Sequence, residues 1–146
     1  MNIAQIILPL NLKGTFTYKV PEDFLDKIEV GMRVLIPFGG KKIYTGIVAE
    51  LFDEFEDSFV PKEIINLLDN QPIVPKQQLG FWNWMSSYYL CNLGEIYRFA
   101  FPSSLKLESE TYVRLLSERT IDWQNLDADE TYLLQALEVR QMLNLQ

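Results

Sequence analysis

The fold is decided by the stretch Val30-Gly31-Met32-Arg33-Val34-Leu35-Ile36-Pro37-Phe38-Gly39-Gly40-Lys41-Lys42, which continues as Ile43-Tyr44-Thr45-Gly46-Ile47-Val48. The β-branched and apolar run 33–36 predicts a strand. Pro37 cannot donate to a sheet ladder, so it belongs at the end of that strand or at a sheet edge. The second half of the stretch runs back as another strand, expected to extend over 44–52. The two halves therefore predict a β-hairpin.

The tip of this hairpin is a candidate site for an anion. It consists of two glycines and two lysines, Gly39, Gly40, Lys41 and Lys42. A bare glycine turn lets backbone amides come close to a phosphate, and the ammonium groups favour negative charge. The same residues also suit a solvated turn, since glycine satisfies the geometry and lysine keeps it soluble. Taken alone, the local pattern favours the solvated turn.

Three more strands are expected in the first 70 residues, over 2–8, 15–20 and 62–68. The segment 15–20 alternates, which places Phe16, Tyr18 and Val20 on one face of its strand. A short helical turn is expected over 21–25, and the acidic segment 53–58 is expected to be a solvated loop. Five short strands separated by turn signals predict a small antiparallel β-barrel.

Beyond residue 72 the pattern changes to helical spacing. Helices are expected over 77–90 and 95–101, separated by the break at 92–94 and ended by Pro102. Their aromatic side chains could stack on bases, but helical spacing favours packing against the barrel. These side chains are Phe81, Trp82, Trp84, Tyr88, Tyr89, Tyr97, Phe99 and Phe101.

After Pro102 the composition becomes acidic, which indicates a second domain. A strand is expected over 111–116 and a helix from Ala128, with Asp127 as N-cap and Glu130 completing a capping box. The expected apolar face of this helix comprises Leu133, Leu134, Leu137, Met142 and Leu143. We expect the chain to leave this domain incomplete. The fold class is mainly β with helices, α+β.

Composition restricts the function. The net charge is −7, but residues 1–46 hold six basic against four acidic side chains. A broad DNA footprint needs more positive surface, whereas a site for one or two nucleotides does not. The chain has no histidine and a single cysteine, Cys91, so histidine acid–base catalysis is excluded and the usual zinc ligands are missing. The sequence also contains no phosphate-loop motif.

The chain also resembles a known family through an ordered series of motifs over residues 3–102. It is similar to the N-terminal part of primosomal protein N′, the PriA family of replication-restart helicases. The motifs are Leu8-Pro9-Leu10, Thr15-Phe16-Thr17-Tyr18 with Val20-Pro21, Gly31 to Gly39, Thr45-Gly46-Ile47-Val48, Lys62-Glu63-Ile64, Leu67-Leu68-Asp69, Pro72, Tyr88-Tyr89, Leu93-Gly94-Glu95 and Phe101-Pro102.

The resemblance implies two domains. Residues 1–105 would form the family's 3′-end DNA-binding domain, an OB-like β-barrel with helices, and residues 106–146 the truncated start of a winged-helix domain. The first would bind the 3′-OH end of the nascent leading strand at stalled or abandoned forks, whatever the sequence, to direct primosome assembly and replisome reloading.

The resemblance also implies where the DNA end binds. The family's pocket positions fall on Phe16, Thr17, Gly39 and Lys62, although many members have aspartate where this chain has Thr17. A threonine offers a neutral donor and acceptor in place of a carboxylate. Adding the neighbouring tyrosine and the hairpin tip gives the full expected site: Phe16, Thr17, Tyr18, Gly39, Gly40, Lys41, Lys42 and Lys62.

For the complete protein the resemblance implies an ATP-dependent 3′–5′ DNA helicase that uses ATP, Mg and Zn outside this fragment. Its partners would be primosome proteins and single-stranded-DNA-binding protein. The fragment itself is expected to hold no catalytic residue, metal or cofactor. Without a signal peptide or an apolar run of 18 residues, a cytoplasmic, nucleoid-associated location without membrane contact is expected. The alternative is a non-catalytic β-barrel that binds protein, which would not require a free 3′-OH.

Overall fold

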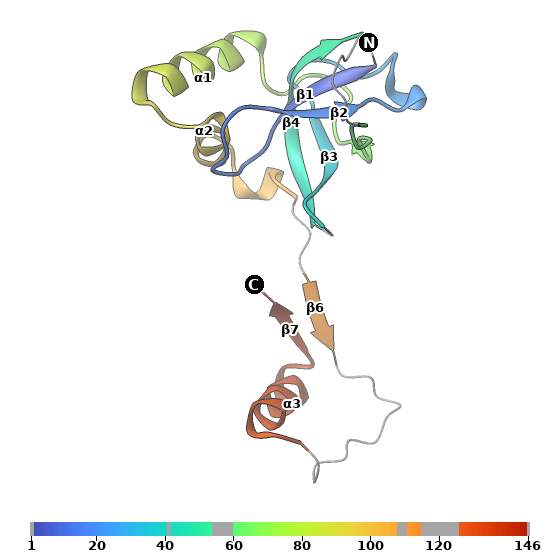
Figure 1. Ribbon diagram of the computed structural model, residues 1–146, viewed down its shortest axis with the longest axis vertical. Helices are drawn as coiled ribbons and strands as arrows, with labels where there is room; N and C mark the ends of the chain where they lie inside the picture. Colours follow the sequence, from blue (N-terminus) through green and yellow to red (C-terminus); the bar gives the residue numbers. More distant parts are fainter. Residues whose placement is uncertain (1, 41, 54–59, 108–110, 115–125, 146) are drawn as a thin grey trace. The chain divides into compact units, whose positions relative to one another are not determined.

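The computed structural model describes residues 2–40, 42–53, 60–107, 111–114 and 126–145. The chain divides into two compact units, residues 1–109 and 110–146 (Figure 1). The acidic segment expected as a solvated loop lies almost entirely outside the described residues. Each unit is described below by itself.

The first unit is built on one antiparallel sheet in the order β2-β1-β4-β3-β5. Its strands are β1 (Ile3–Ile7), β2 (Phe16–Lys19), β3 (Arg33–Phe38), β4 (Lys42–Phe52) and β5 (Asn66–Leu67). The edge strand β2 also meets the segment just before β5, where the Lys19 amide donates to the Lys62 carbonyl at 2.9 Å and the Ile64 amide to the Lys19 carbonyl at 3.0 Å. This contact closes the sheet into the expected small barrel.

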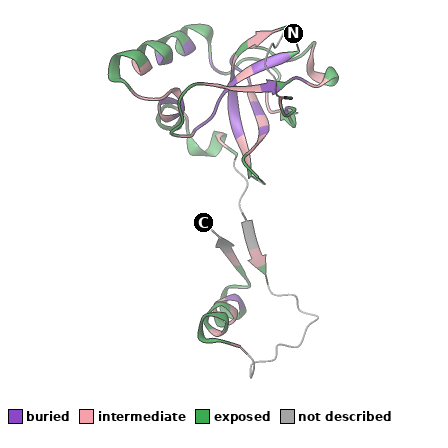
Figure 2. Ribbon diagram, in the orientation of Figure 1, coloured by how far each residue is buried: buried purple, intermediate pink, exposed green. Residues whose placement is uncertain are grey.

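Apolar side chains lie on both faces of the central strands. Ile6 and Val48 pack inside the barrel, while their neighbours Ile7 and Ile47 pack on its outer face. The outer cluster is completed by helical residues, among them Leu79, Trp82, Ile96 and Tyr97. Figure 2 shows the buried residues concentrated along β1 and β4 (Figure 2). Burial on both faces explains why β1 reads as a nearly continuous apolar run rather than an alternating one.

Two helices cover the outer face of the barrel, α1 (Lys76–Tyr89) and α2 (Leu93–Ala100), with short 3₁₀ turns at η1 (Glu22–Phe24) and η2 (Ser103–Leu105). The helix α1 ends where Leu90 adopts a left-handed conformation with φ 54°. At the start of α2, Gly94 lies so close to the β1–β2 connection that a Cβ would be 2.0 Å from the Leu10 carbonyl oxygen. Glycine is therefore required for α2 to pack here.

The expectation that the helical aromatics pack against the barrel is only partly correct. Trp82 and Tyr97 are buried and Phe101 is half-buried, as a packing face requires. Four of the others are exposed because α1 turns a second aromatic face away from the barrel; they are Phe81, Trp84, Tyr88 and Tyr89. The remaining one, Phe99, is exposed on α2.

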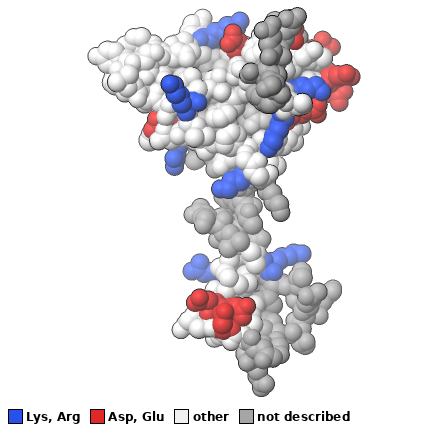
Figure 3. Space-filling model, viewed as in Figure 1, with Lys and Arg blue, Asp and Glu red and all other residues white. Residues whose placement is uncertain are grey.

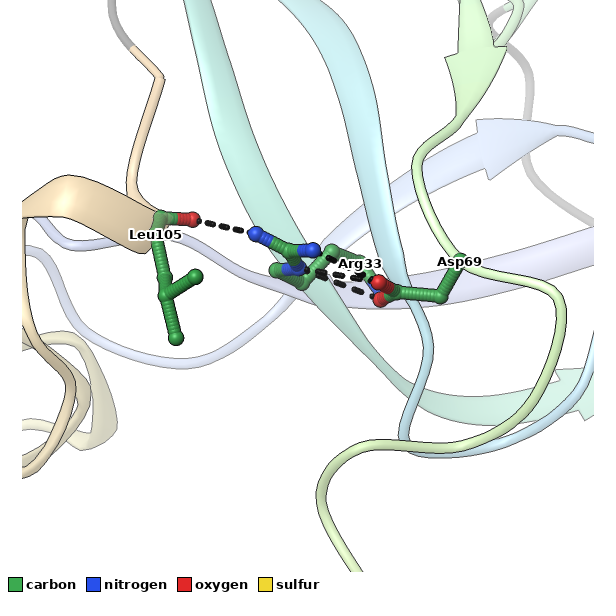
Figure 4. A network of polar contacts seen from close by, with 3 residues as sticks. All are labelled: Arg33, Asp69 and Leu105. Carbon is green, nitrogen blue, oxygen red and sulfur yellow. Dashed lines mark hydrogen bonds and ion pairs between the residues drawn. The ribbon is translucent and has the colours of Figure 1, made fainter.

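An arginine joins three segments of the first unit. The Arg33 side chain forms a bidentate ion pair with Asp69, with Nη2 to Oδ1 at 2.6 Å, and its Nη1 donates to the Leu105 carbonyl at 3.0 Å (Figure 4). The hydrogen bonds to Asp69 raise the pKa of Arg33. The network ties β3 to the segment after β5 and to η2.

Two strands differ in extent from their expected ranges. β3 runs through Pro37, which pairs with Ile43 of β4. This is tolerated because β5 pairs only with Val34 and Leu35, so Pro37 lies at an open edge. The strand expected over 62–68 is reduced to β5, because its first residues bond to β2 instead.

The second unit contains β6 (Thr111–Arg114), α3 (Ala128–Arg140) and β7 (Met142–Leu145), with β6 and β7 antiparallel. The capping box is confirmed: the Glu130 amide donates to Asp127 Oδ1 at 2.8 Å, and the Asp127 amide to Glu130 Oε2 at 3.1 Å. Placing Met142 and Leu143 on the helix was wrong, because Gln141 ends α3 with φ 60° and both residues pair with β6. Residues 115 and 116 of the expected strand lie outside the described part.

Two features are absent from the described residues. No helix there has the length and apolar content that crossing a membrane would require. Nor do the described residues gather three or more histidine, cysteine or acidic side chains in an arrangement suited to a metal ion.

Candidate nucleic-acid interface

A pocket with a volume of ≈ 360 Å³ opens where β2, the end of β3 and the segment 60–62 meet. Its lining residues are Phe16, Thr17, Tyr18, Pro37, Phe38, Gly39, Val60 and Lys62. Five of the residues expected from the sequence are thus brought together from three distant segments. The volume lies near the lower end of the roughly 300–1,000 Å³ range of ligand pockets, which suits one small unit rather than a duplex.

Barrel closure places the lysine of this pocket. Because the Lys62 carbonyl accepts from the Lys19 amide, the segment 60–62 is fixed beside β2. The Lys62 side chain reaches across to the hairpin, where Nζ donates to the Gly39 carbonyl at 3.0 Å. An ammonium group has three donors, so this bond leaves capacity for contacts to a phosphate or hydroxyl.

The hairpin tip supplies an open backbone. Gly39 has φ 65°, a conformation that favours glycine, and no heavy atom lies within 4 Å of the place where a Cβ would stand. A ligand can therefore approach the main chain closely at this position. Gly40 and Lys42 are exposed and do not line the pocket, and Lys41 lies outside the described residues.

Aromatic rings form the apolar side of the pocket. The rings of Phe16 and Phe38 meet edge to face with centroids 4.9 Å apart, and Phe38 meets Tyr44 in the same way at 6.1 Å. Both phenylalanines are half-buried. They offer a rigid surface against which a base or a sugar can pack.

Tyr18 acts mainly as the floor of the pocket. It is 4% exposed, and its hydroxyl donates to the Pro37 carbonyl at 2.9 Å. Burial raises the pKa of Tyr18 to about 12, so the phenol is neutral at physiological pH. The hydrogen bond holds the end of β3, and with it the backbone that leads to Gly39.

The hydroxyl of Thr17 is engaged by a residue that the sequence reasoning missed. Gln5 Nε2 donates to Thr17 Oγ1 at 3.0 Å, and Thr15 Oγ1 donates to Gln5 Oε1 at 2.9 Å. Since Oγ1 of Thr17 accepts from Gln5, its own proton is available to donate. The signal that could have identified Gln5 is its position as the one polar residue in the apolar run 3–8.

Three other lining residues, Pro37, Phe38 and Val60, were also missed. Pro37 and Phe38 precede Gly39 directly, so their neighbourhood in the chain was the available signal. Val60 is 91% exposed and carried no signal, because it enters the pocket only through barrel closure. Beside the pocket, the Lys19 ammonium is paired with the Glu63 carboxylate at 2.8 Å. Lys19 does not line the pocket, and the lysine among the lining residues is Lys62.

Comparison with known proteins gives a consistent family match. A family model described as the PriA 3′ DNA-binding domain matches residues 5–102. The chain is 33% identical over 138 residues to "Replication restart protein PriA" of Haemophilus influenzae, covering 92% of this chain and 18% of that protein. It is 30% identical over 120 residues to the protein of the same name from Bacillus subtilis, covering 79% of this chain and 15% of that protein.

A third relative, "Replication restart protein PriA" of Rickettsia conorii, is 33% identical over 108 residues, which cover 72% of this chain and 16% of that protein. The chain therefore spans less than a fifth of the length of each of these relatives. All eight residues that line the pocket fall inside the range that the family model matches.

Proposed function

Because the chain belongs to the family of PriA 3′ DNA-binding domains, we propose that it binds the 3′-OH end of a DNA strand in the pocket between Phe16, Gly39 and Lys62. The observation that carries this proposal is the convergence of these three residues on one pocket from separate segments of the chain. An aromatic wall, an open backbone and an ammonium group match the base or sugar, the terminal hydroxyl and the last phosphate of a strand.

Each group has a distinct part in this binding. The ring pair of Phe16 and Phe38 packs against the terminal base or sugar, where stacking contributes roughly 1–3 kcal/mol per base. The open backbone at Gly39 leaves room for the terminal hydroxyl beside the main chain. Lys62 neutralises the terminal phosphate. Recognition by shape and a few contacts is independent of sequence and requires little positive charge, which agrees with the net charge of −7.

Thr17 takes the place of the aspartate expected from the family resemblance. With Gln5 donating to its oxygen, the threonine hydroxyl is oriented as a donor. A neutral donor binds an oxygen of the sugar or phosphate, whereas a carboxylate would only accept. We therefore infer that the contact is retained with reversed hydrogen-bond polarity.

We infer a wider role from the same family. The complete protein would be an ATP-dependent helicase that restarts replication, with ATP, Mg and Zn bound outside this chain and primosome proteins and single-stranded-DNA-binding protein as partners. The leading-strand end at a stalled fork would be the ligand of the pocket. The arrangement of α3 between two paired strands supports the proposal that residues 106–146 begin a winged-helix domain.

The test compares three fork DNAs by fluorescence anisotropy at one low salt concentration. The first has a leading-strand 3′-OH at the branch, the second carries a 3′-phosphate there, and the third lacks the leading strand. We expect the first to bind most tightly. Equal binding to all three would contradict the proposal, and absence of binding would favour the protein-binding alternative.

A further inference from the structure

Val60 is an apolar side chain that lines the pocket and has no part in the binding proposed above. It is 91% exposed and belongs to the same segment as Lys62. A single exposed apolar side chain is common on a protein surface and by itself indicates nothing. In the lining of a ligand pocket, however, its surface is in water only until a ligand covers it, and covering it is favourable.

Two anchors and a proline hold Val60 beside the pocket. The Lys62 carbonyl accepts from the Lys19 amide at 2.9 Å, and Lys62 Nζ donates to the Gly39 carbonyl at 3.0 Å. Pro61 lies between Val60 and this anchored residue. The ring of a proline fixes its own φ near about −65°, and the residue before it is restricted to extended conformations. Val60 is therefore held at the pocket by barrel closure.

The pocket has three walls, and Val60 lies on a different wall from the aromatic rings. The walls are β2, the end of β3 and the segment 60–62. The rings of Phe16 and Phe38, with centroids 4.9 Å apart, join the first two walls, whereas Val60 belongs to the third. A flat apolar group that packs against the rings can therefore be contacted by Val60 from another side. In a terminal nucleotide, that group is the base.

Charge makes only a local contribution to DNA binding at this pocket. Lys62 is the basic side chain among the lining residues, in a chain of net charge −7. On the face in view, Figure 3 shows Lys and Arg side chains scattered rather than gathered into one broad positive surface (Figure 3). A protein that contacts few phosphates gains little affinity from released counterions. Apolar contacts in the pocket therefore have to supply more of the affinity.

We propose that Val60 is a further ligand-contacting residue, which packs against the base of the 3′-terminal nucleotide while the Phe16–Phe38 pair packs against another side of that base. The inference rests on the proposed function and deepens it, because it assigns the apolar part of the pocket to the base. An aliphatic side chain does not distinguish the hydrogen-bonding groups of the four bases. The contact is therefore compatible with binding that is independent of sequence.

The test measures the affinity of the whole chain for two short single strands that both end in 3′-OH, by fluorescence anisotropy at one low salt concentration. One strand has an ordinary terminal nucleotide, and the terminal residue of the other is an abasic tetrahydrofuran. The variant Val60→Ser removes the apolar side chain. Its matched control is Val139→Ser, which changes a valine of 84% exposure on α3. Both valines are exposed, so neither change should affect folding, and urea unfolding checks this.

We expect Val60→Ser to weaken binding of the ordinary strand about three-fold or more, because the base loses an apolar contact. Binding of the abasic strand should stay the same, since it has no base for Val60 to contact. Val139→Ser should bind both strands like the unmodified chain.

The proposal is overturned if Val60→Ser binds the ordinary strand as tightly as the unmodified chain, or if it loses the same factor with both strands. Either result leaves the proposed function standing as long as the unmodified chain prefers the 3′-OH fork to the 3′-phosphate fork. Equal binding of those two forks would instead contradict the pocket itself.

Discussion

At the scale of single residues, the pocket separates residues that contact a ligand from residues that hold the pocket in shape. Lys62 is exposed and reaches over the pocket to Gly39. Tyr18 is buried beneath it, with its hydroxyl bonded to the Pro37 carbonyl. Replacing the first should therefore change binding without changing stability, and replacing the second should change stability first.

The first prediction concerns Lys62. Lys62→Ala should weaken binding of a 3′-OH fork roughly ten-fold or more, because a charged hydrogen bond to the ligand is lost. The urea midpoint should stay within error of the unmodified chain. Lys27→Ala, an exposed lysine outside the pocket lining, is the matched control and should bind normally. Equal affinities for the two variants would remove Lys62 from the site.

The second prediction concerns pH. Burial raises the pKa of Tyr18 from 10.0 to about 12, so the folded chain keeps this proton while the unfolded chain loses it. The unfolded state is therefore favoured as pH rises from about 10 to 12, and the free energy of unfolding should fall over this range. Tyr18→Phe should cost about 0.5–1.5 kcal/mol at pH 7 through the lost hydrogen bond.

Urea unfolding at pH 7 and at several values above 10 measures both effects. The difference in stability between the unmodified chain and Tyr18→Phe should shrink as the pH rises above 10, since other alkaline titrations are common to the two proteins. A constant difference up to pH 11.5 would mean that the Tyr18 phenol titrates normally in the folded chain.

At the scale of elements, the strands and helices were largely predictable, because each has a clear local pattern. The alternation of 15–20 and the glycine tip of the hairpin define β2, β3 and β4 with small errors at their ends. The reduction of 62–68 to β5 was not predictable, since it depends on barrel closure between residues more than 40 positions apart. The prediction that the aromatic side chains of α1 pack against the barrel was only partly correct for a related reason. Helical spacing shows which residues share a face but not which face is covered.

The candidate site was predictable to a similar degree. Phe16, Thr17, Gly39 and Lys62 were expected from the family resemblance, and the structure places all four on one pocket. Gln5 and Val60 were not expected, because their places depend on strand pairing and on closure rather than on a local motif.

The third prediction tests the network that joins β3 to the segments after β5 and α2. The side chains of Arg33 and Asp69 are only 16% and 7% exposed, so removing one partner leaves a buried charge. Asp69→Ala should lower the free energy of unfolding by about 3–5 kcal/mol. The exposed pair Lys19–Glu63, with exposures of 53% and 57%, is the control, and Glu63→Ala should cost no more than about 1 kcal/mol. Urea unfolding measures both variants. Similar losses of unfolding free energy in Asp69→Ala and Glu63→Ala would contradict the prediction that the buried ion pair contributes more than the exposed one.

The fourth prediction compares two helical glycines. In Gly94→Ala the new Cβ would meet the Leu10 and Leu8 carbonyl oxygens at 2.0 and 2.3 Å, so α2 must move off the barrel and stability should fall. Gly80 in α1 has no atom within 4 Å of its Cβ position, so Gly80→Ala should raise stability by up to about 1 kcal/mol through helix propensity. Thermal unfolding should therefore shift in opposite directions. A stable Gly94→Ala would contradict the close packing of α2.

At the scale of the whole molecule, the charge distribution agrees with binding at a strand end. A net charge of −7 does not suit a protein that coats DNA, but one ammonium and an open backbone suffice for one terminal nucleotide. The chain spans less than a fifth of the length of each of the three PriA relatives compared above. The central claim is that the 3′ end enters the pocket beside Gly39.

Amide NMR of the whole chain tests this claim most directly, by titration with a short single strand ending in 3′-OH and with the same strand ending in 3′-phosphate. We predict that the amide signals of Phe16, Gly39 and Lys62 shift with the 3′-OH strand and shift much less with the blocked strand. The Gly14 amide, in an exposed turn outside the pocket lining, should stay in place with both. Equal shifts of the pocket signals with both strands, or no shift at Gly39 with either, would contradict the account.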